Sequence, residues 1–379
     1  MIIQNGLVFR KEGKIERADV RVEDGIISQV GEINDLRDGE ETLEASGKYV
    51  VPGFVDIHIH GAAGHDFCDG KEDSLEQIAR YERSCGVTAF CPTSMSLPVE
   101  ELQEIFRRTD EYAGKMSNND CARILGIHLE GPFLARDRKG AQKEEYLRNP
   151  DRKFFQRLQE ASGNRILIVT LAPELPGAME FIREAGEHTA PGKKMTVSLG
   201  HSEADYGTVM EAFRAGADHV THLWNAMPGM HHRQPGIAGA AMDRGDVTVE
   251  LICDGQHVHP AMIRGAFRLF GPERICLVSD SMEATGMPDG EYCLGGQKVY
   301  KKDGEARLAD GTLAGSVTNL YECFRRAVRF GVPLEEALRA VTYNPARSIG
   351  MEKKVGVIEP GAFADILLLN KELELEKVL

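Results

Sequence analysis

Positive charge is in short supply in this sequence, whose 379 residues carry a formal net charge of −14. A nucleic-acid-binding protein needs a basic footprint to neutralise phosphates, so we expect no nucleic-acid partner. No apolar run approaches the roughly 20 residues that a membrane helix needs, and we expect no membrane partner. The N-terminus lacks a basic region followed by an apolar signal segment. We therefore expect a cytoplasmic protein.

Two further patterns are missing from the chain. The eight cysteines include no CxxC pair, which argues against a disulfide framework and against a thiolate zinc site. Cys276, within the apolar run 275–278, is expected to be a small core residue. No G-x-G-x-x-G motif follows a strand candidate, so nothing indicates a dinucleotide-binding fold.

Both ends of the chain read as short strands with tight turns. Asp24-Gly25 lies between the strand candidates 20–22 and 26–27, which is a good hairpin signal. Near the other end, a Pro360-Gly361 turn precedes the apolar run 364–369. Because chain termini often lie close together, we expect residues 1–53 and 351–379 to form one small β-sandwich domain.

Between residues 54 and 350 the pattern changes to strand-like runs that alternate with helix-like segments, as βα units require. In one unit, the strand candidate 196–199 precedes a helix that is broken near Gly216, and the next strand begins at His219. Pro98 and Pro260 mark the first turns of two more helices. About eight such units fit a (β/α)8 TIM-like barrel better than an open sheet. We therefore predict an α/β fold with a barrel over residues 54–350.

Histidines and carboxylates stand at the ends of these predicted strands. His58 and His60 share one face of the strand candidate 55–61, because side chains at i and i+2 point the same way. Glu130 ends the apolar strand candidate that begins at Ile124, where a carboxylate is costly unless it is paired or coordinated. Taken singly, the histidine pair could be a chance pattern, and Glu130 could pair with an arginine at the barrel mouth.

The remaining strand ends favour one shared site. His201 and His222 each follow a strand candidate, and Asp280 follows the strand candidate 275–278. Strand ends of a barrel converge on one mouth, so these side chains are expected to meet there. Histidine and carboxylate ligands together suit zinc, iron or another divalent first-row ion. His128 shares the face of Glu130, and we interpret it as a packing or supporting residue.

Several motifs in this chain carry a resemblance to known proteins. In chain order they are V-P-G-F-V-D-I-H-I-H-G at 51–61, H-L-E-G-P-F at 128–133, G-H-S at 200–202, T-H-L-W-N-A-M at 221–227, D-G-Q-H at 254–257, V-S-D at 278–280, L-A-G-S at 313–316 and P-G-A-F-A-D-I at 360–366. The first and last resemble signatures of the amidohydrolase superfamily. The others are similar to the N-acetylglucosamine-6-phosphate deacetylase family within it, so the resemblance covers nearly the whole chain.

The resemblance assigns roles to the matching positions. Glu130, His201 and His222 resemble the main metal ligands, while His58 and His60 resemble ligands of a second metal that some members have lost. One or two divalent ions, zinc or iron, are therefore implied as cofactors. The positions that resemble substrate-binding groups are Ala141, Gln142, Asn225, Ala226, Arg233, Asp254, Gly255, Gln256, His257, Leu313, Ala314 and Gly315. Gln142 stands where some members have a histidine.

This family resemblance implies hydrolysis of the acetamide of N-acetylglucosamine 6-phosphate to glucosamine 6-phosphate and acetate, in amino-sugar catabolism. A metal lowers the pKa of its bound water from about 15.7 towards 7, which supplies hydroxide as the nucleophile. Asp280 would be the general base and acid. Arg233, beside His231 and His232, is the best candidate for the phosphate unless this segment is only an exposed polar loop. Related enzymes share this arginine across a dimer interface, so a homodimer is expected.

Two other readings of the motifs remain open. The same fold could hydrolyse a cyclic amide, as a dihydroorotase does, although no lysine ends a suitable strand here to bridge two metals and the motif 225–227 disfavours it. Alternatively, the chain could be an inactive scaffold that serves in binding or assembly. Such scaffolds usually lose metal ligands or the catalytic aspartate, whereas all six positions are filled in this sequence.

Overall fold

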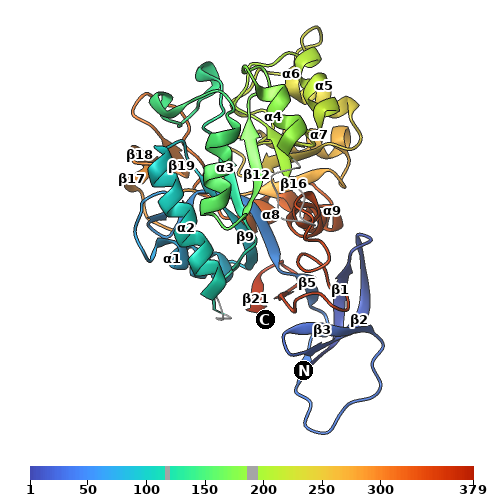
Figure 1. The fold of residues 1–379 in the computed structure, drawn as a ribbon. Helices are drawn as coiled ribbons and strands as arrows, with labels where there is room; N and C mark the ends of the chain where they lie inside the picture. Colours follow the sequence, from blue (N-terminus) through green and yellow to red (C-terminus); the bar gives the residue numbers. More distant parts are fainter. Residues whose placement is uncertain (116–119, 186–194) are drawn as a thin grey trace.

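Parallel strands close into a barrel in the computed structural model of the chain, which describes residues 1–115, 120–185 and 195–379 (Figure 1). In hydrogen-bonded order they are β6 (Phe54–Ile59), β9 (Val87–Ser94), β11 (Ile127–Glu130), β12 (Ile166–Leu171), β13 (Thr196–Leu199), β14 (His219–Val220), β15 (Thr248–Ile252) and β16 (Ile275–Val278). The ring closes where Ile59 bridges Ser281 and the backbone N–H of Asp280 donates to the carbonyl of His58. The predicted α/β barrel is confirmed.

One predicted strand differs in detail. The apolar run from Ile124 to Glu130 forms two pieces, β10 (Arg123–Ile124) and β11, which both pair with β9. The break falls at Leu125-Gly126, where a Cβ on Gly126 would lie 2.5 Å from the side chain of Leu167. The close approach of the neighbouring strand therefore requires glycine and interrupts the ladder.

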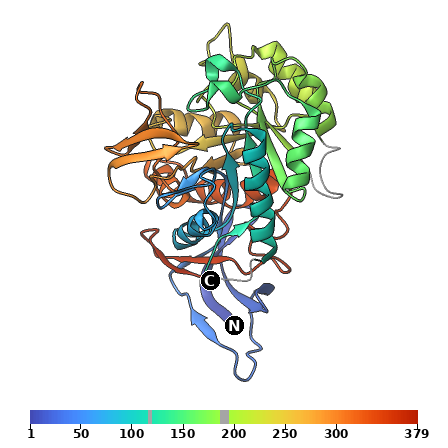
Figure 2. The same cartoon turned by 60° about the vertical axis from the view of Figure 1, so that its left-hand side comes forward.

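Helices cover the outside of the barrel (Figures 1 and 2). They are α1 (Ser74–Ser84), α2 (Val99–Lys115), α3 (Arg152–Ala161), α4 (Ala178–Glu184), α5 (Tyr206–Ala215), α6 (Gly236–Asp243), α7 (Pro260–Phe270), α8 (Leu320–Arg329), α9 (Leu334–Val341) and α10 (Tyr343–Ser348). Helix α7 buries Ile263, Ala266, Phe267 and Phe270, a helical spacing that places its apolar face on the strands. Because helices lie on one side and the barrel interior on the other, the central strands are buried along their whole length.

A seven-stranded sheet joins the two ends of the chain, and both termini lie there (Figures 1 and 2). Its strands are β1 (Ile2–Arg10), β2 (Lys14–Glu23), β3 (Ile26–Gly31), β4 (Thr42–Glu44), β5 (Tyr49–Pro52), β20 (Ile366–Leu369) and β21 (Leu375–Val378). The predicted hairpin at Asp24-Gly25 joins β2 to β3, and β20 pairs antiparallel with β5. We propose residues 1–53 and 351–379 as the bounds of this small β domain, with the barrel domain between them.

An antiparallel sheet that the sequence analysis did not predict follows the last barrel strand. It consists of β17 (Gly290–Leu294), β18 (Gln297–Lys302) and β19 (Glu305–Arg307), and it projects from the barrel in Figure 2. Leu294 and Val299 pack with Met95, Ala141 and Met282 in a small apolar cluster of their own. This sheet thereby forms part of the wall at the barrel mouth. In the part of the chain that the structure describes, no helix combines the length and apolarity that a membrane span requires.

Candidate metal centre and active site

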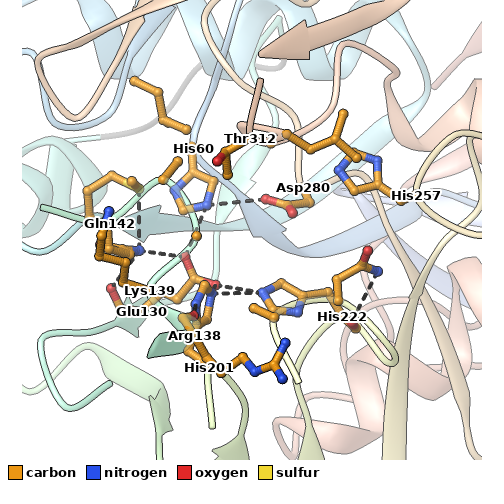
Figure 3. A pocket seen from close by; sticks show the side chains of 18 of the residues that line it. His60, Glu130, Arg138, Lys139, Gln142, His201, His222, His257, Asp280 and Thr312 are labelled. Carbon is orange, nitrogen blue, oxygen red and sulfur yellow. Dashed lines mark hydrogen bonds and ion pairs between the residues drawn. The ribbon is translucent and has the colours of Figure 1, made fainter. Parts of the chain in front are cut away.

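A cavity of about 460 Å³ opens where the barrel strands end (Figure 3). The predicted site residues that line it are His60, Glu130, Ala141, Gln142, His201, His222, Asn225, Ala226, His257, Asp280, Leu313 and Gly315. The predicted residues that are not among its described lining residues are His58, Arg233, Asp254, Gly255, Gln256 and Ala314. Figure 3 shows the histidines and carboxylates pointing toward one another from different strands.

Short turns after the strands aim these side chains into the cavity. His201, His222 and Asp280 are each the second residue after the end of β13, β14 and β16, and their backbone φ angles are 49°, 26° and 47°. Residues other than glycine rarely adopt positive φ, and each such residue costs on the order of 1–3 kcal/mol. Strain of this kind at three strand ends is typical of a functional site, where the surrounding structure holds it in place.

Glu130 is the centre of the first ligand group. Its Oε1 lies 3.1 Å from Nε2 of His201 and 3.2 Å from Nε2 of His222. The two imidazole nitrogens are themselves 3.0 Å apart. One ring can donate to the other at that distance, and if both nitrogens carried lone pairs a cation shared between them would remove their repulsion. The structure brings together the three residues that the family resemblance implies as the main metal ligands, with their ligand atoms within 4.8 Å of one another.

A second group lies beside the first. His58, His60 and Asp280 offer ligand atoms close enough to share an ion, and all three are buried. Nε2 of His60 lies 3.2 Å from Oδ1 of Asp280 and 3.3 Å from Oε2 of Glu130. Nε2 of His58 lies 3.4 Å from Oε1 of Glu130. Glu130 thus faces both groups, and its two oxygens would be available to an ion in either.

The electrostatics of the cluster favour bound positive charge. Burial alone would lower the pKa of His60, but its hydrogen bonds with Asp280 and Glu130 raise that pKa to about 9. Burial would raise the pKa of Asp280, yet the neighbouring His58 and His60 lower it to about 2. Buried carboxylates that stay ionised need a cationic partner. Without a metal the protonated His60 imidazole supplies this charge. A divalent ion would supply it instead once the ring gives up the Nε2 proton, and the imidazole and carboxylate donors fit a first-row metal.

Outer hydrogen bonds orient the ligand imidazoles. The Nδ1 atom of His201 lies 2.7 Å from the carbonyl oxygen of Arg138, and that of His60 lies 3.1 Å from the carbonyl oxygen of Thr93. A carbonyl only accepts hydrogen bonds, so each Nδ1 carries the proton and each Nε2 keeps its lone pair for a metal. The described structure therefore fits the predicted cofactor class.

Gln142 supports the central carboxylate. It is buried, its Nε2 donates to Oε2 of Glu130 over 3.0 Å, and its Oε1 accepts the backbone N–H of Ser96 over 2.6 Å. His128 is also fully buried, and both of its ring nitrogens hydrogen-bond to groups outside the cluster, the carbonyl of Ile57 and the hydroxyl of Thr170. These bonds agree with the interpretation of His128 as a packing or supporting residue.

His257 faces the cavity from the loop that follows β15. Its Nδ1 lies 2.7 Å from Oδ2 of Asp254, whose other oxygen accepts the backbone N–H groups of Gln256 and His257. Burial would lower the pKa of His257, but the bond to Asp254 raises it. The bond to Asp254 thus fixes the ring with a proton on Nδ1 and favours the imidazolium form, in which Nε2 also carries a proton, while the Gly255-Gln256 backbone forms the turn between the two residues.

Sequence reasoning missed several residues at the site. Arg136, Arg138 and Lys139 line the cavity, whereas Arg233 lies on an exposed loop. The missed basic residues lie in a loop with no periodic pattern, so only the basic run R-D-R-K at 136–139 could have drawn attention to them. Glu250, in the middle of β15, was also missed, and its Oε2 lies 2.8 Å from Nδ1 of His58.

Comparison with known proteins agrees with this geometry. The model of the amidohydrolase family matches residues 49–378. The chain belongs to the amidohydrolase family. Within it, the chain is 35% identical to an N-acetylglucosamine-6-phosphate deacetylase of Lysinibacillus sphaericus, with 100% of this chain and 96% of the relative covered. It is 33% identical to an N-acetylgalactosamine-6-phosphate deacetylase of Escherichia coli O157:H7, with 98% and 95% covered.

Solved structures of amidohydrolases agree with the sequence relatives. An Asp-to-Ala variant of the N-acetyl-D-glucosamine-6-phosphate deacetylase from Mycobacterium smegmatis, in complex with N-acetyl-D-glucosamine 6-phosphate, is similar with a TM-score of 0.91 and 33% identity. The match covers 100% of this chain and 97% of that one. The chain is therefore a hydrolase of the N-acetylglucosamine-6-phosphate deacetylase family, and the resemblance stated from its motifs is confirmed.

Proposed function

We propose that this protein hydrolyses the acetamide of N-acetylglucosamine 6-phosphate and releases glucosamine 6-phosphate and acetate, as a cytoplasmic step of amino-sugar catabolism. The observation that carries the proposal is the convergence of Glu130, His201 and His222 with Asp280 on one cavity. Deacetylase relatives that align along almost the full chain support the same substrate class.

The two ligand groups would hold one or two divalent ions, zinc or iron. Glu130, His201 and His222 would hold the first, and His58 and His60, beside Asp280, the second. A bound ion would supply Lewis acidity, which acidifies water and polarises the acetyl carbonyl. The buried, strained setting of these side chains keeps the donors in place before the substrate arrives.

Asp280 would accept the proton of the attacking water and then deliver it to the leaving nitrogen, because an amine leaves poorly unless it is protonated. Its carboxylate lies on the cavity wall beside His60. His257, held by Asp254, would donate from Nε2 to the oxygen that becomes negative during the attack. Asp280 would thus move the proton to the amide nitrogen, while His257 would stabilise the negative oxygen of the same amide.

The sugar and its phosphate would be held by the outer part of the cavity. The walls around the sugar would be both polar and apolar, and they would come from Asn225, Ala226, Ala141, Gln142 and the segment 313–315. The loop 254–257 would add its backbone. Arg233 would bind the phosphate across the interface of a homodimer. The support for this assignment is its exposed position outside its own chain's cavity wall.

An acetate-release assay tests the proposal. Purified protein with its metal retained is expected to release acetate from N-acetylglucosamine 6-phosphate, and dialysis against a chelator should abolish the release until zinc or iron is restored. N-acetylgalactosamine 6-phosphate serves as a parallel substrate, because one relative acts on it by name. Ring opening of dihydroorotate in place of acetate release would indicate the cyclic-amide alternative. No turnover and no bound metal would indicate a scaffold.

A further inference from the structure

Glu250 is a fully buried carboxylate inside the barrel, below the cavity rather than on its described wall. It lies in the middle of β15 and meets groups from β6 and from the turn after β14. We propose that Glu250 is a positioning residue that prepares His58 to bind the second ion and couples that site to the first. The inference rests on the metal site of the proposed function and adds a residue to which no role has been assigned.

The contact with His58 decides which nitrogen of the ring can bind metal. Oε2 of Glu250 lies 2.8 Å from Nδ1 of His58. An ionised carboxylate can only accept, so Nδ1 carries the proton and Nε2 keeps a free lone pair. That Nε2 is buried and has no hydrogen-bond partner among the described residues, and it faces Glu130 and Asp280 at 3.4 and 3.6 Å. An orphaned buried nitrogen between two carboxylates is the feature that a cation would complete.

The same carboxylate also holds a ligand of the first ion. Oε2 of Glu250 accepts the backbone N–H of His222 over 3.1 Å, and the backbone carbonyl of Glu250 accepts that of Leu223 over 2.9 Å. His222 has a φ of 26°, a conformation that needs support from its surroundings. Glu250 supplies that support from both its side chain and its main chain. One residue therefore orients a ligand of each ion.

A different role, as a metal ligand itself, fits Glu250 less well. Glu250, His58 and His128 offer atoms close enough to one another for a third ion. Both nitrogens of His128, however, already hydrogen-bond to the carbonyl of Ile57 and the hydroxyl of Thr170. The Nδ1 of His58 is likewise engaged by Glu250. Two of the three groups would have to break short buried hydrogen bonds to bind, which favours the supporting role.

Titration of metal-free protein with Co²⁺, followed by visible absorption and by metal analysis, tests the inference. The wild type is expected to bind two ions per chain. Glu250→Ala should weaken the second ion by about 10- to 100-fold, the usual effect of losing an outer-shell partner, with a smaller loss at the first ion. Glu250→Gln can still accept from His58 and His222, so it should recover part of the affinity. Glu82→Gln, a change at another fully buried glutamate, should bind both ions as the wild type does.

A second background separates positioning from general structural support. In His58→Asn protein the second site is already lost, so adding Glu250→Gln should cause no further loss at the second ion and a small change at the first. The inference would be overturned if Glu250→Ala bound both ions with wild-type affinity. It would also be overturned if Glu250→Ala weakened the binding of both ions by the same factor while Glu250→Gln bound them as the wild type does. A wild type that releases acetate with a single bound ion would also overturn it and leave the proposed function standing. A wild type that binds two ions without releasing acetate would contradict the proposed function and leave the role of Glu250 standing.

Discussion

At the scale of single residues, Asp280 is both ionised and exposed to the cavity. It is an ionised carboxylate on the cavity wall, and its Oδ1 lies 3.2 Å from Nε2 of His60. We predict that Asp280→Asn lowers kcat for acetate release by about 10²- to 10⁴-fold, because the amide has no basic oxygen for the proton transfer. The first ion, held by Glu130, His201 and His222, should remain at one per chain in metal analysis.

The matched control for this prediction is Asp66→Asn, a change at another buried aspartate, whose oxygens accept the backbone N–H groups of Cys68 and Gly295. It should retain kcat within a few-fold. Acetate release by Asp280→Asn at the wild-type rate would show that another group moves the proton, and the mechanism proposed for Asp280 would then be wrong.

Strand ends made most of the candidate site predictable residue by residue. His58 and His60 share a face by strand parity, and Glu130 is a costly carboxylate at the end of an apolar strand, so both signals are local. Glu250 lies within the apolar run 247–253, and its partner His58 is 192 residues away in sequence. The cost of burying a lone glutamate there predicts some partner, but only the closed barrel shows which one.

At the scale of elements, the alternation of strands and helices predicted the barrel but not the antiparallel sheet that follows its last strand. The strands β17 to β19 alternate like any hairpin strands, but they fall between β16 and α8, where a βα unit needs only a short loop. Leu294 and Val299 make this sheet pack on Met95 and Ala141 from other segments. Because that packing joins distant parts of the chain, no local period could reveal that the sheet borders the cavity.

Helix α8 allows a stability prediction at this scale. Asn319 caps it, with Oδ1 accepting the backbone N–H of Glu322 over 2.9 Å. Phe324 on its buried face packs on Phe54, the first residue of the strand that carries His58, with ring centroids 5.2 Å apart. We predict that Asn319→Ala lowers the free energy of unfolding by about 1 kcal/mol, because the cap is lost.

Urea-induced unfolding of the metal-free protein measures this effect of the cap. Asn319→Ser keeps an oxygen that can cap the helix, so it should retain most of the stability. Neither variant should change kcat by more than about twofold, since the hydrogen bonds that Asn319 makes to described residues involve none that line the cavity. Equal destabilisation by the serine and alanine variants would point instead to the lost bond between Asn319 and the Tyr81 hydroxyl.

At the scale of the whole molecule, the charge of −14 makes recognition of a phosphorylated sugar a local problem. Arg136, Arg138 and Lys139 bring positive charge to the cavity, but Arg136 and Arg138 pair with Glu144 and Glu203. Among the described residues, Arg233 forms no ion pair with a carboxylate, and it lies on an exposed loop. Lys139 forms no ion pair among the described residues, but its ammonium is a single point charge, whereas an unpaired arginine can bind a phosphate through two N–H groups. A second subunit would bring Arg233 to the cavity.

Subunit mixing tests that arrangement. Arg233→Ala protein should lose acetate release at low substrate concentration because the phosphate loses its bidentate partner, and Asp280→Asn protein should lose turnover. In a two-fold dimer that combines one subunit of each, the Arg233→Ala subunit keeps its Asp280 and receives an intact Arg233 from its partner. Such mixed dimers, isolated with two affinity tags, should regain about half of the wild-type rate at low substrate. If each Arg233 served its own chain, both sites of the mixed dimer would be defective and no rate would return. A monomer in gel filtration under assay conditions would exclude the shared site altogether, because an arginine outside its own cavity would then have no cavity to complete.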